Sequence, residues 1–310
     1  MQNFKKVFFV FAMAGLILAC SIASAPTTTA PDQQNVATIV AGTIQAVTAA
    51  APAATSSIPP TQPAPTQAAQ PAGIPVSFQN VSFIIPSGLA SGASPQAIPN
   101  NPSDQNNGPW AVAPAHIEFT LDNYNLPADH FSQVFIDVYP AQEYASMYDG
   151  ARISLQRLQA ILSSPSSPLT NENLPQVPNF NAASMFAAQA KLIQFKNGSG
   201  ARFVTQYGQA VGPINNSATF YNFEGLTNDG KYYIIVVLPI QAPLLANGID
   251  PNAPLPAGGV PFPDYNSPDA TVFNNYYQAI TDKMNATSPD SFAPSIIILD
   301  ALIQSITITP

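Results

Sequence analysis

The pattern that most restricts the fold of this chain is a series of four apolar segments, which are typical of two consecutive β-hairpins. The segments are residues 190–195, 201–208, 219–226 and 231–238. Residues 197–200 (Asn-Gly-Ser-Gly) separate the first pair and residues 227–230 (Thr-Asn-Asp-Gly) the second, and both stretches tolerate the positive φ of hairpin turns. Because residues 234–238 are continuously apolar, the last strand is expected to be central and covered on both faces. An antiparallel sheet is therefore the predicted core.

Other segments with regularly spaced apolar residues predict further strands and helices. Alternating apolar residues predict strands at 76–85, 115–121, 133–139 and 305–309. Apolar residues at helical spacing predict helices at 144–162, 272–284 and 295–304. The proline-rich stretch 239–268 is expected to be a long loop, longer than the usual limit of about 15 residues. We expect one α+β domain over residues 75–310, an antiparallel sheet of six or more strands with packed amphipathic helices.

The composition excludes several classes of protein. Hydrophobic residues make up 46% of the 310 residues, which is enough apolar surface for a core. Cys20 is the only cysteine, so an internal disulfide, a cysteine zinc finger and an iron–sulfur cluster are all excluded. With nine Lys and Arg against seventeen Asp and Glu, the chain lacks the positive charge of a nucleic-acid-binding protein.

The first twenty residues have the pattern of a secretion signal. Lys5 and Lys6 precede an apolar run at 7–18, which is too short to span a membrane comfortably. The run ends in Ile-Leu-Ala-Cys (17–20), which resembles the lipobox of bacterial lipoproteins, with a larger residue than usual at Leu18. The resemblance implies removal of the signal peptide, residues 1–19, and attachment of acyl chains such as palmitate to Cys20. The protein would then be anchored to the extracytoplasmic face of a bacterial cell membrane without crossing it. The alternatives are a signal peptide cleaved elsewhere and an uncleaved anchor.

A low-complexity spacer is predicted between this anchor and the folded domain. Residues 20–74 are mostly Ala, Thr, Pro, Gln and Ser, with a possible short helix at 35–50. Cleavage before Cys20 would remove two lysines and leave seven basic and seventeen acidic residues, a net charge of −10. Anionic headgroups repel such a charge, so the folded domain is expected to stand away from the bilayer.

Two structural segments resemble the PsbP-like fold. Residues 81–90 (VSFIIPSGLA) match the second strand of an opening hairpin with its Pro-small-Gly turn, and residues 299–309 match a final helix that leads into a short strand. This resemblance implies a fold and no functional residue. The signal, the spacer and the segment around 214–233 are also similar to bacterial surface lipoproteins of unknown function.

Few residues could carry catalysis. His116 and His130 are the only histidines, and neither lies in a recognisable hydrolase motif. Paired carboxylates could support glycoside hydrolysis, with Glu118 and Asp137 expected to face outward from neighbouring strands. The other candidate acids are Asp122, Glu143, Glu172 and Glu224. No catalytic residue is assigned.

The remaining binding chemistries are weaker. The loop 247–254, with Asp264 and Asp269, offers oxygen atoms for calcium but lacks the spacing of a calcium loop, and no phosphate-binding glycine motif is present. Arg202 is expected to pair with Glu224 across adjacent hairpins. Aromatic residues could line a ligand groove or belong to the core. They are Trp110, Tyr124, Tyr207, Tyr221, Tyr232, Tyr233, Tyr265, Tyr276 and Tyr277.

The leading functional hypothesis is a surface-tethered lipoprotein whose non-catalytic domain binds an extracellular ligand or an envelope protein. No cofactor, metal or nucleic acid is expected as a partner. One alternative is an extracellular carboxylate-dependent hydrolase. A second is a carrier that holds a small molecule in a pocket under the 239–268 loop.

Overall fold

A computed structural model describes residues 73–102, 108–125, 130–177 and 181–310. The predicted signal peptide (1–19), the lipidation site Cys20 and the possible helix 35–50 lie outside these residues, as does the spacer 20–74 except for its last two residues. The description below concerns the α+β domain alone.

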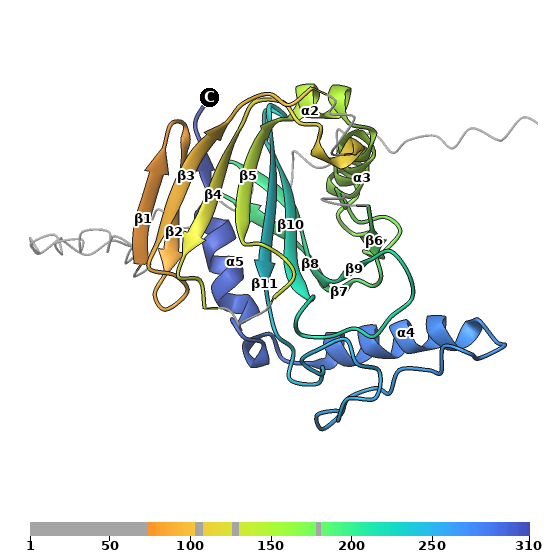
Figure 1. The fold of residues 1–310 in the computed structure, drawn as a ribbon. Coiled ribbons are helices and arrows are strands. Elements are labelled where there is room, and N and C mark those ends of the chain that lie inside the picture. Colours follow the sequence, from red (N-terminus) through yellow and green to blue (C-terminus); the bar gives the residue numbers. More distant parts are fainter. Residues whose placement is uncertain (1–72, 103–107, 126–129, 178–180) are drawn as a thin grey trace, which may run out of the picture. The chain divides into compact units, whose positions relative to one another are not determined.

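A seven-stranded antiparallel sheet is the centre of this domain (Figure 1). Its order is β3-β4-β5-β11-β10-β8-β7. The strands are β3 (Gly92–Ile98), β4 (His116–Asp122), β5 (Phe135–Pro140), β7 (Ala188–Phe195), β8 (Gly198–Thr205), β10 (Phe220–Thr227) and β11 (Tyr232–Pro239). As predicted from its apolar run, β11 is the middle strand, and residues 233–239 are all buried. The domain therefore has the predicted α+β class.

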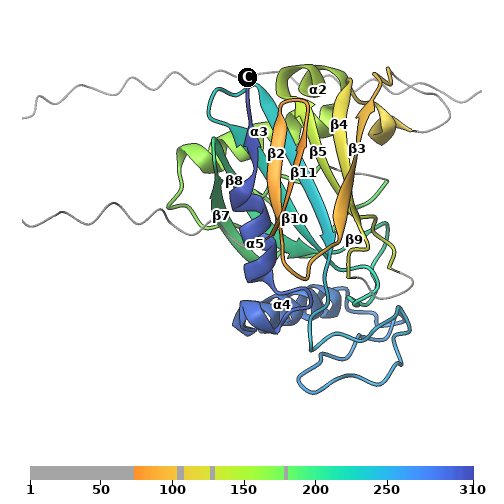
Figure 2. The ribbon, with the colours of Figure 1, turned by 90° about the vertical axis from the view of Figure 1, so that its left-hand side faces the viewer.

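One face of the sheet packs against the C-terminal helix and a small second sheet (Figure 2). The hairpin of β1 (Gly73–Phe78) and β2 (Val81–Pro86) pairs with β12 (Thr307–Ile308). Helix α5 (Ile296–Ser305) contacts both β2 and β7. Helix α4 (Thr271–Ala286) contacts β7, near the lower end of the sheet in Figure 2. The opening hairpin and the C-terminal strand β12 therefore belong to one small sheet.

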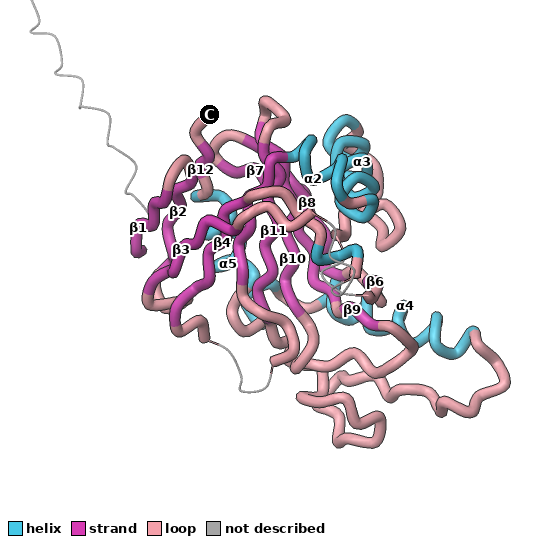
Figure 3. Tube along the Cα trace, turned by 45° about the horizontal axis from the view of Figure 1, so that its top comes forward, coloured by secondary structure: helices cyan, strands magenta, loops and turns pink. Residues whose placement is uncertain are grey.

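The opposite face is covered by α2 (Ala141–Met147), α3 (Asp149–Ser163) and the segment that follows them (Figure 3). Leu155 and Leu158 of α3 pack against β8, β10 and β11 side chains in a second apolar core. The two-residue strands β6 (Ala183–Ser184) and β9 (Tyr207–Gly208) pair beside this core. Because both faces are covered, polar groups on the central strands are removed from water and need partners within the protein.

The structure corrects three predicted boundaries. The helix predicted over 144–162 is broken at Tyr148, which is extended (φ −133°, ψ 120°), so that α2 and α3 can each turn an apolar side toward the sheet. The strand predicted over 76–85 is a hairpin with its turn at Gln79 and Asn80, where Gln79 has a φ of 52°.

The hairpin turn predicted at residues 197–200 is also displaced. It lies at residues 196–197, and Gly198, Ser199 and Gly200 belong to β8 rather than to the turn. Gly200 is needed there for close approach, because a Cβ atom would lie 2.3 Å from the Glu224 carbonyl oxygen on β10. The neighbouring strand therefore explains glycines that the sequence pattern assigns to a turn.

Two further features complete the domain. Strand β3 was not predicted because it contains Pro95, which a strand at the edge of a sheet can accommodate.

The predicted loop 239–268 contains no helix or strand beyond Pro239, the last residue of β11, and its first part is fixed by backbone hydrogen bonds between Gln241 and Ala293. Within the described ranges, no helix has both the length and the apolar character needed to cross a membrane.

Candidate functional site

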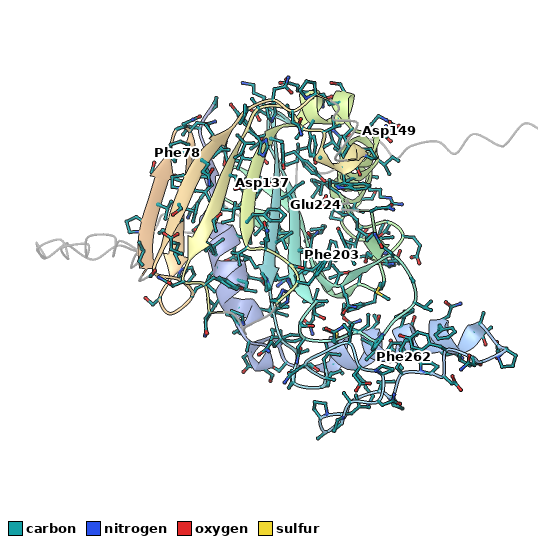
Figure 4. The ribbon with its side chains drawn as sticks, in the orientation of Figure 1. Phe78, Asp137, Asp149, Phe203, Glu224 and Phe262 are labelled. Carbon is teal, nitrogen blue, oxygen red and sulfur yellow. The ribbon has the colours of Figure 1, made fainter. Side chains whose placement is uncertain are left out.

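Three of the candidate acids lie in one row across the sheet. Glu118 on β4 is directly opposite Asp137 on β5, and Asp137 is opposite Ile235 on β11. Ile235 is in turn opposite Glu224 on β10. Since residues directly opposite in a sheet project from the same face, all three carboxyl groups face the α2 and α3 layer. Asp137 and Glu224 are two strands apart, about 10 Å, and Figure 4 labels both.

A cavity of about 200 Å³ lies over the first two of these acids. Its wall combines acidic, amide and aromatic side chains with apolar residues of the sheet. The lining residues are Trp110, Glu118, Gln133, Phe135, Asp137, Tyr139, Tyr144, Val177, Tyr207, Asn222, Ile235 and Val237. We call it the Asp137 cavity. A cavity of this volume can hold only a small ligand.

Asp137 is the chemically unusual group of this cavity. The residue is 6% exposed, and its Oδ2 atom accepts a hydrogen bond of 2.7 Å from the Tyr139 hydroxyl. Its Oδ1 atom is buried and has no hydrogen-bond partner. Burial, together with the nearby Glu118, raises the pKa of Asp137 from 3.8 to about 8, although the Tyr139 hydrogen bond opposes this shift. The carboxyl group therefore holds a proton at neutral pH unless a ligand supplies positive charge.

Stacked rings form one side of the cavity. The Tyr139 ring stacks on Tyr144 of α2 with centroids 4.2 Å apart, and on its other side it lies 4.3 Å from the His116 ring. His116 lies half-buried at the start of β4, where its Nδ1 is 2.8 Å from the Pro114 carbonyl oxygen. Burial lowers the pKa of His116, which favours its neutral form. This stack keeps Tyr139 in place to donate to Asp137.

Glu224 does not line the cavity, but it forms hydrogen bonds with two residues that do, Val177 and Asn222. Its carboxylate accepts hydrogen bonds from the Ser154 hydroxyl (2.6 Å), the Val177 backbone N–H (2.8 Å) and the Tyr233 hydroxyl. The Asn222 side-chain amide also donates to it, at 3.5 Å. Burial raises the pKa of Glu224, and these donors oppose the shift. The interactions hold α3 and the Val177 segment against the sheet.

The predicted Arg202–Glu224 ion pair is wrong. The register places Arg202 opposite Phe223 and Glu224 opposite Ala201, so the two charged side chains project from opposite faces of the sheet. Arg202 instead donates to Asp300 of α5, with Nε 3.2 Å from Oδ1, and the Tyr221 hydroxyl donates to the same oxygen at 2.9 Å. This pair attaches α5 to the sheet.

Replacing Asp300 by alanine is expected to lower the free energy of unfolding by about 2–3 kcal/mol, because Arg202 would remain buried without its counter-charge. Asp149→Ala is the matched control, since Asp149 pairs with Arg152 at the exposed surface of α3 and its loss should cost at most about 0.5 kcal/mol. Urea unfolding followed by circular dichroism measures both. Equal effects of the two substitutions would contradict a structural role for the buried pair.

The other predicted acids lie away from the cavity. Asp122 accepts a hydrogen bond from the Ser94 hydroxyl, and Glu143 and Glu172 are exposed. His130 is half-buried, with its Nε2 2.9 Å from the Thr219 carbonyl oxygen, and burial lowers its pKa. None of these residues joins Asp137.

The proposed calcium residues accept hydrogen bonds within their own turns. Asp250, Asp264 and Asp269 accept from backbone N–H groups two residues further along the chain. The described ranges contain no group of three or more His, Cys, Asp or Glu side chains placed to hold a metal ion.

Of the nine candidate aromatic residues, Trp110 and Tyr207 line the Asp137 cavity. Tyr124, Tyr221, Tyr233 and Tyr276 are buried core residues, and the Tyr233 hydroxyl donates to Glu224. Tyr232 and Tyr277 are half-buried, and Tyr265 is exposed. Most of the aromatic residues therefore stabilise the fold.

Two other hollows differ from the Asp137 cavity. The hollow behind residues 244–262 of the 239–268 loop has a volume of about 10 Å³, room for a single water molecule. An open hollow of about 810 Å³ lies beside Tyr207 and is bordered by the exposed side chains of Phe131 and Ile249. The described residues around this open hollow include no charged side chain.

Sequence reasoning missed the cavity residues Tyr139, Tyr144 and Asn222. The alternation of residues 133–139 places Tyr139 on the same side of its strand as Asp137, which was a usable signal. Tyr144 and Asn222 come from different elements, and no local pattern brings them together. Comparisons with protein-family models, with curated proteins and with solved structures find no match.

Proposed function

We propose that this chain is a lipid-anchored protein of the extracytoplasmic face of a bacterial membrane, and that its α+β domain binds a small molecule without converting it. One observation carries the binding role. Asp137 lines a cavity of about 200 Å³, and its Oδ1 atom is buried without a hydrogen-bond partner. An unpaired buried oxygen costs about 1–3 kcal/mol, and a bound donor would recover this energy.

The anchoring half of the proposal rests on residues 17–20 and on Cys20 being the only cysteine. We expect mass spectrometry of the protein from bacterial membranes to find Cys20 as the acylated N-terminal residue. A Cys20→Ser variant should move from the detergent phase to the aqueous phase. Recovery of wild-type protein with an unmodified Cys20 thiol would contradict the anchor and leave the binding role to be tested separately.

The binding half can be followed through Trp110, the only tryptophan of the chain, because it lines the cavity. Purified protein is titrated with glucose, acetate, choline and n-butylammonium, and the fluorescence of Trp110 is recorded. We expect a saturable change with at least one probe, with one site found by equilibrium dialysis. A Trp110→Phe variant should remove the signal. Folded protein that gives no saturable response and no uptake in dialysis with any of the four probes would contradict small-ligand binding.

A hydrolase is the second candidate, because Glu118 and Asp137 are directly opposite on adjacent strands. Side chains at such positions have Cβ atoms about 5 Å apart, and retaining glycosidases hold their two carboxyl groups at a similar separation. Hydrolysis of 4-nitrophenyl glycosides that is lost in Glu118→Gln would support this function over simple binding. Binding is preferred because a cavity of about 200 Å³ has little room for the sugars on both sides of a glycosidic bond.

An envelope protein could also be the partner of the anchored domain. Crosslinking in cells followed by mass spectrometry tests this form of the proposal. A dominant partner that is lost in Cys20→Ala would favour an assembly role, and the titrations above would then decide whether the cavity has a separate ligand.

A further inference from the structure

We infer that the ligand of the Asp137 cavity is a small organic ammonium ion. This inference rests on the proposed binding function and names its ligand class. The geometry that carries it is a buried carboxyl oxygen without a partner, a second acid beside it, and a wall of aromatic rings.

The charge of the cavity favours a cation. Its wall contains Glu118 and Asp137, and none of its described lining residues is a lysine or an arginine. Arg202, the one buried arginine among the described residues, lies on the opposite face and is paired with Asp300. A bound anion would meet two carboxyl groups and no counter-charge, whereas a cation would supply the missing positive charge.

The unpartnered oxygen favours a ligand that donates a hydrogen bond. Asp137 Oδ2 is already occupied by the Tyr139 hydroxyl, which leaves Oδ1 as the free acceptor. Oδ1 is buried, so an ammonium N–H, or a hydroxyl group close to the charge, can donate to it once the Asp137 carboxyl group turns toward the cavity that this residue lines. Such charge-assisted hydrogen bonds are about twice as strong as neutral ones.

The aromatic wall favours an organic cation over a metal ion. Trp110, Tyr144 and Tyr207 line the same space, and an aromatic face turned toward an ammonium group attracts it by about 0.5–2 kcal/mol. Both faces of Tyr139 are covered, by Tyr144 and by His116, so this ring contributes through its hydroxyl group. A calcium ion would need six to eight oxygen ligands, and the cavity offers two carboxyl groups beside the amides of Gln133 and Asn222. The described residues contain no group of three or more Asp, Glu, His or Cys side chains placed to hold a metal ion. The volume of about 200 Å³ suits a small amine and excludes a long polyamine.

The experiment compares charged probes with neutral molecules of the same shape. Choline is paired with 3,3-dimethylbutan-1-ol, and n-butylammonium with 1-butanol, and binding is measured by Trp110 fluorescence and by calorimetry. We expect at least one ammonium probe to bind ten-fold or more tightly than its neutral counterpart. Asp137→Asn should weaken the charged probe ten-fold or more and change the neutral one less than two-fold.

Glu118→Gln provides a second variant in case Asp137→Asn disturbs folding, because Glu118 is only half-buried. It should weaken the ammonium probe several-fold and leave the neutral probe unchanged. The cation inference would be overturned if the neutral probes bind as tightly as the charged ones in both pairs. Saturation by glucose or acetate alone would also overturn it. Both outcomes would leave the binding function intact. No binding of any probe would overturn the function itself.

Discussion

Replacing Glu224 by alanine is expected to lower the free energy of unfolding by about 3–5 kcal/mol, the largest effect of any single substitution considered for this domain. The Glu224 carboxylate is fully buried and accepts from Ser154, Val177 and Tyr233. Alanine would leave the Val177 N–H without an acceptor and open a cavity between α3 and the sheet. Urea unfolding followed by circular dichroism at pH 7 measures the loss.

Glu224→Gln is the matched control, because glutamine has nearly the same shape and keeps one acceptor oxygen. Its amide group can donate to the Ser154 or Tyr233 hydroxyl, which are themselves 2.9 Å apart and able to accept. We expect Glu224→Gln to retain most of the stability lost in the alanine variant. If both variants lose the same free energy of unfolding, Glu224 stabilises the domain through its charge and not through its size and hydrogen bonds.

Stability is expected to fall as the pH rises from 5 to 8, and Asp137 should account for about 4 kcal/mol of the change. The pKa of Asp137 is about 8 in the folded domain and 3.8 as its ordinary value. Between these values the folded state holds a proton that the unfolded state has lost, so raising the pH favours unfolding. The stabilisation is fully present below about pH 4 and is lost by the time the pH passes 8.

The groups that face Asp137 determine how this prediction is measured. They are Glu118, Tyr139, Tyr144 and, two strands away, Glu224, whose raised pKa gives a change of the same sign. His116 and His130 have lowered pKa values, so they destabilise the fold below about pH 6.5 and act in the opposite direction.

Subtracting the Asp137→Asn variant from the wild type at each pH cancels these other contributions. The wild type should lose about 4 kcal/mol more than the variant between pH 5 and pH 8, measured by urea unfolding. A difference below about 1 kcal/mol would mean that Asp137 is ionised in the folded domain, and the cavity would then contain a permanent charge.

The strands and helices that carry strong local patterns could be predicted from the sequence. The continuous apolar run at 234–238 correctly identified the central strand, because only a strand covered on both faces needs such a run. Helix α5 and strand β12 followed from their apolar periodicity. The break at Tyr148 could not be predicted, because residues 144–162 keep their helical spacing across it and the break serves contacts with distant strands.

The candidate site was predictable only in part. The alternation in β4 and β5 indicated that Glu118 and Asp137 could be neighbours, and the register confirms it. The expectation that both face outward is wrong for Asp137, which is buried because α2 covers this face of the sheet. The same reasoning paired Arg202 with Glu224, which is wrong because a shift of one residue in register moves a side chain to the other face. Register depends on pairing between strands that are far apart in the sequence, and composition alone does not encode it.

The sequence by itself determined the α+β class, the antiparallel sheet with β11 at its centre, and the scarcity of catalytic and basic side chains. These properties follow from local spacing and composition, which act over a few residues. Only the tertiary structure decided that Asp137 lies buried beneath Tyr139 and Tyr144, with one oxygen unpaired. The pKa and the binding chemistry of this carboxyl group depend on its removal from water, and that requires α2, β4, β5 and β10 to come together in space.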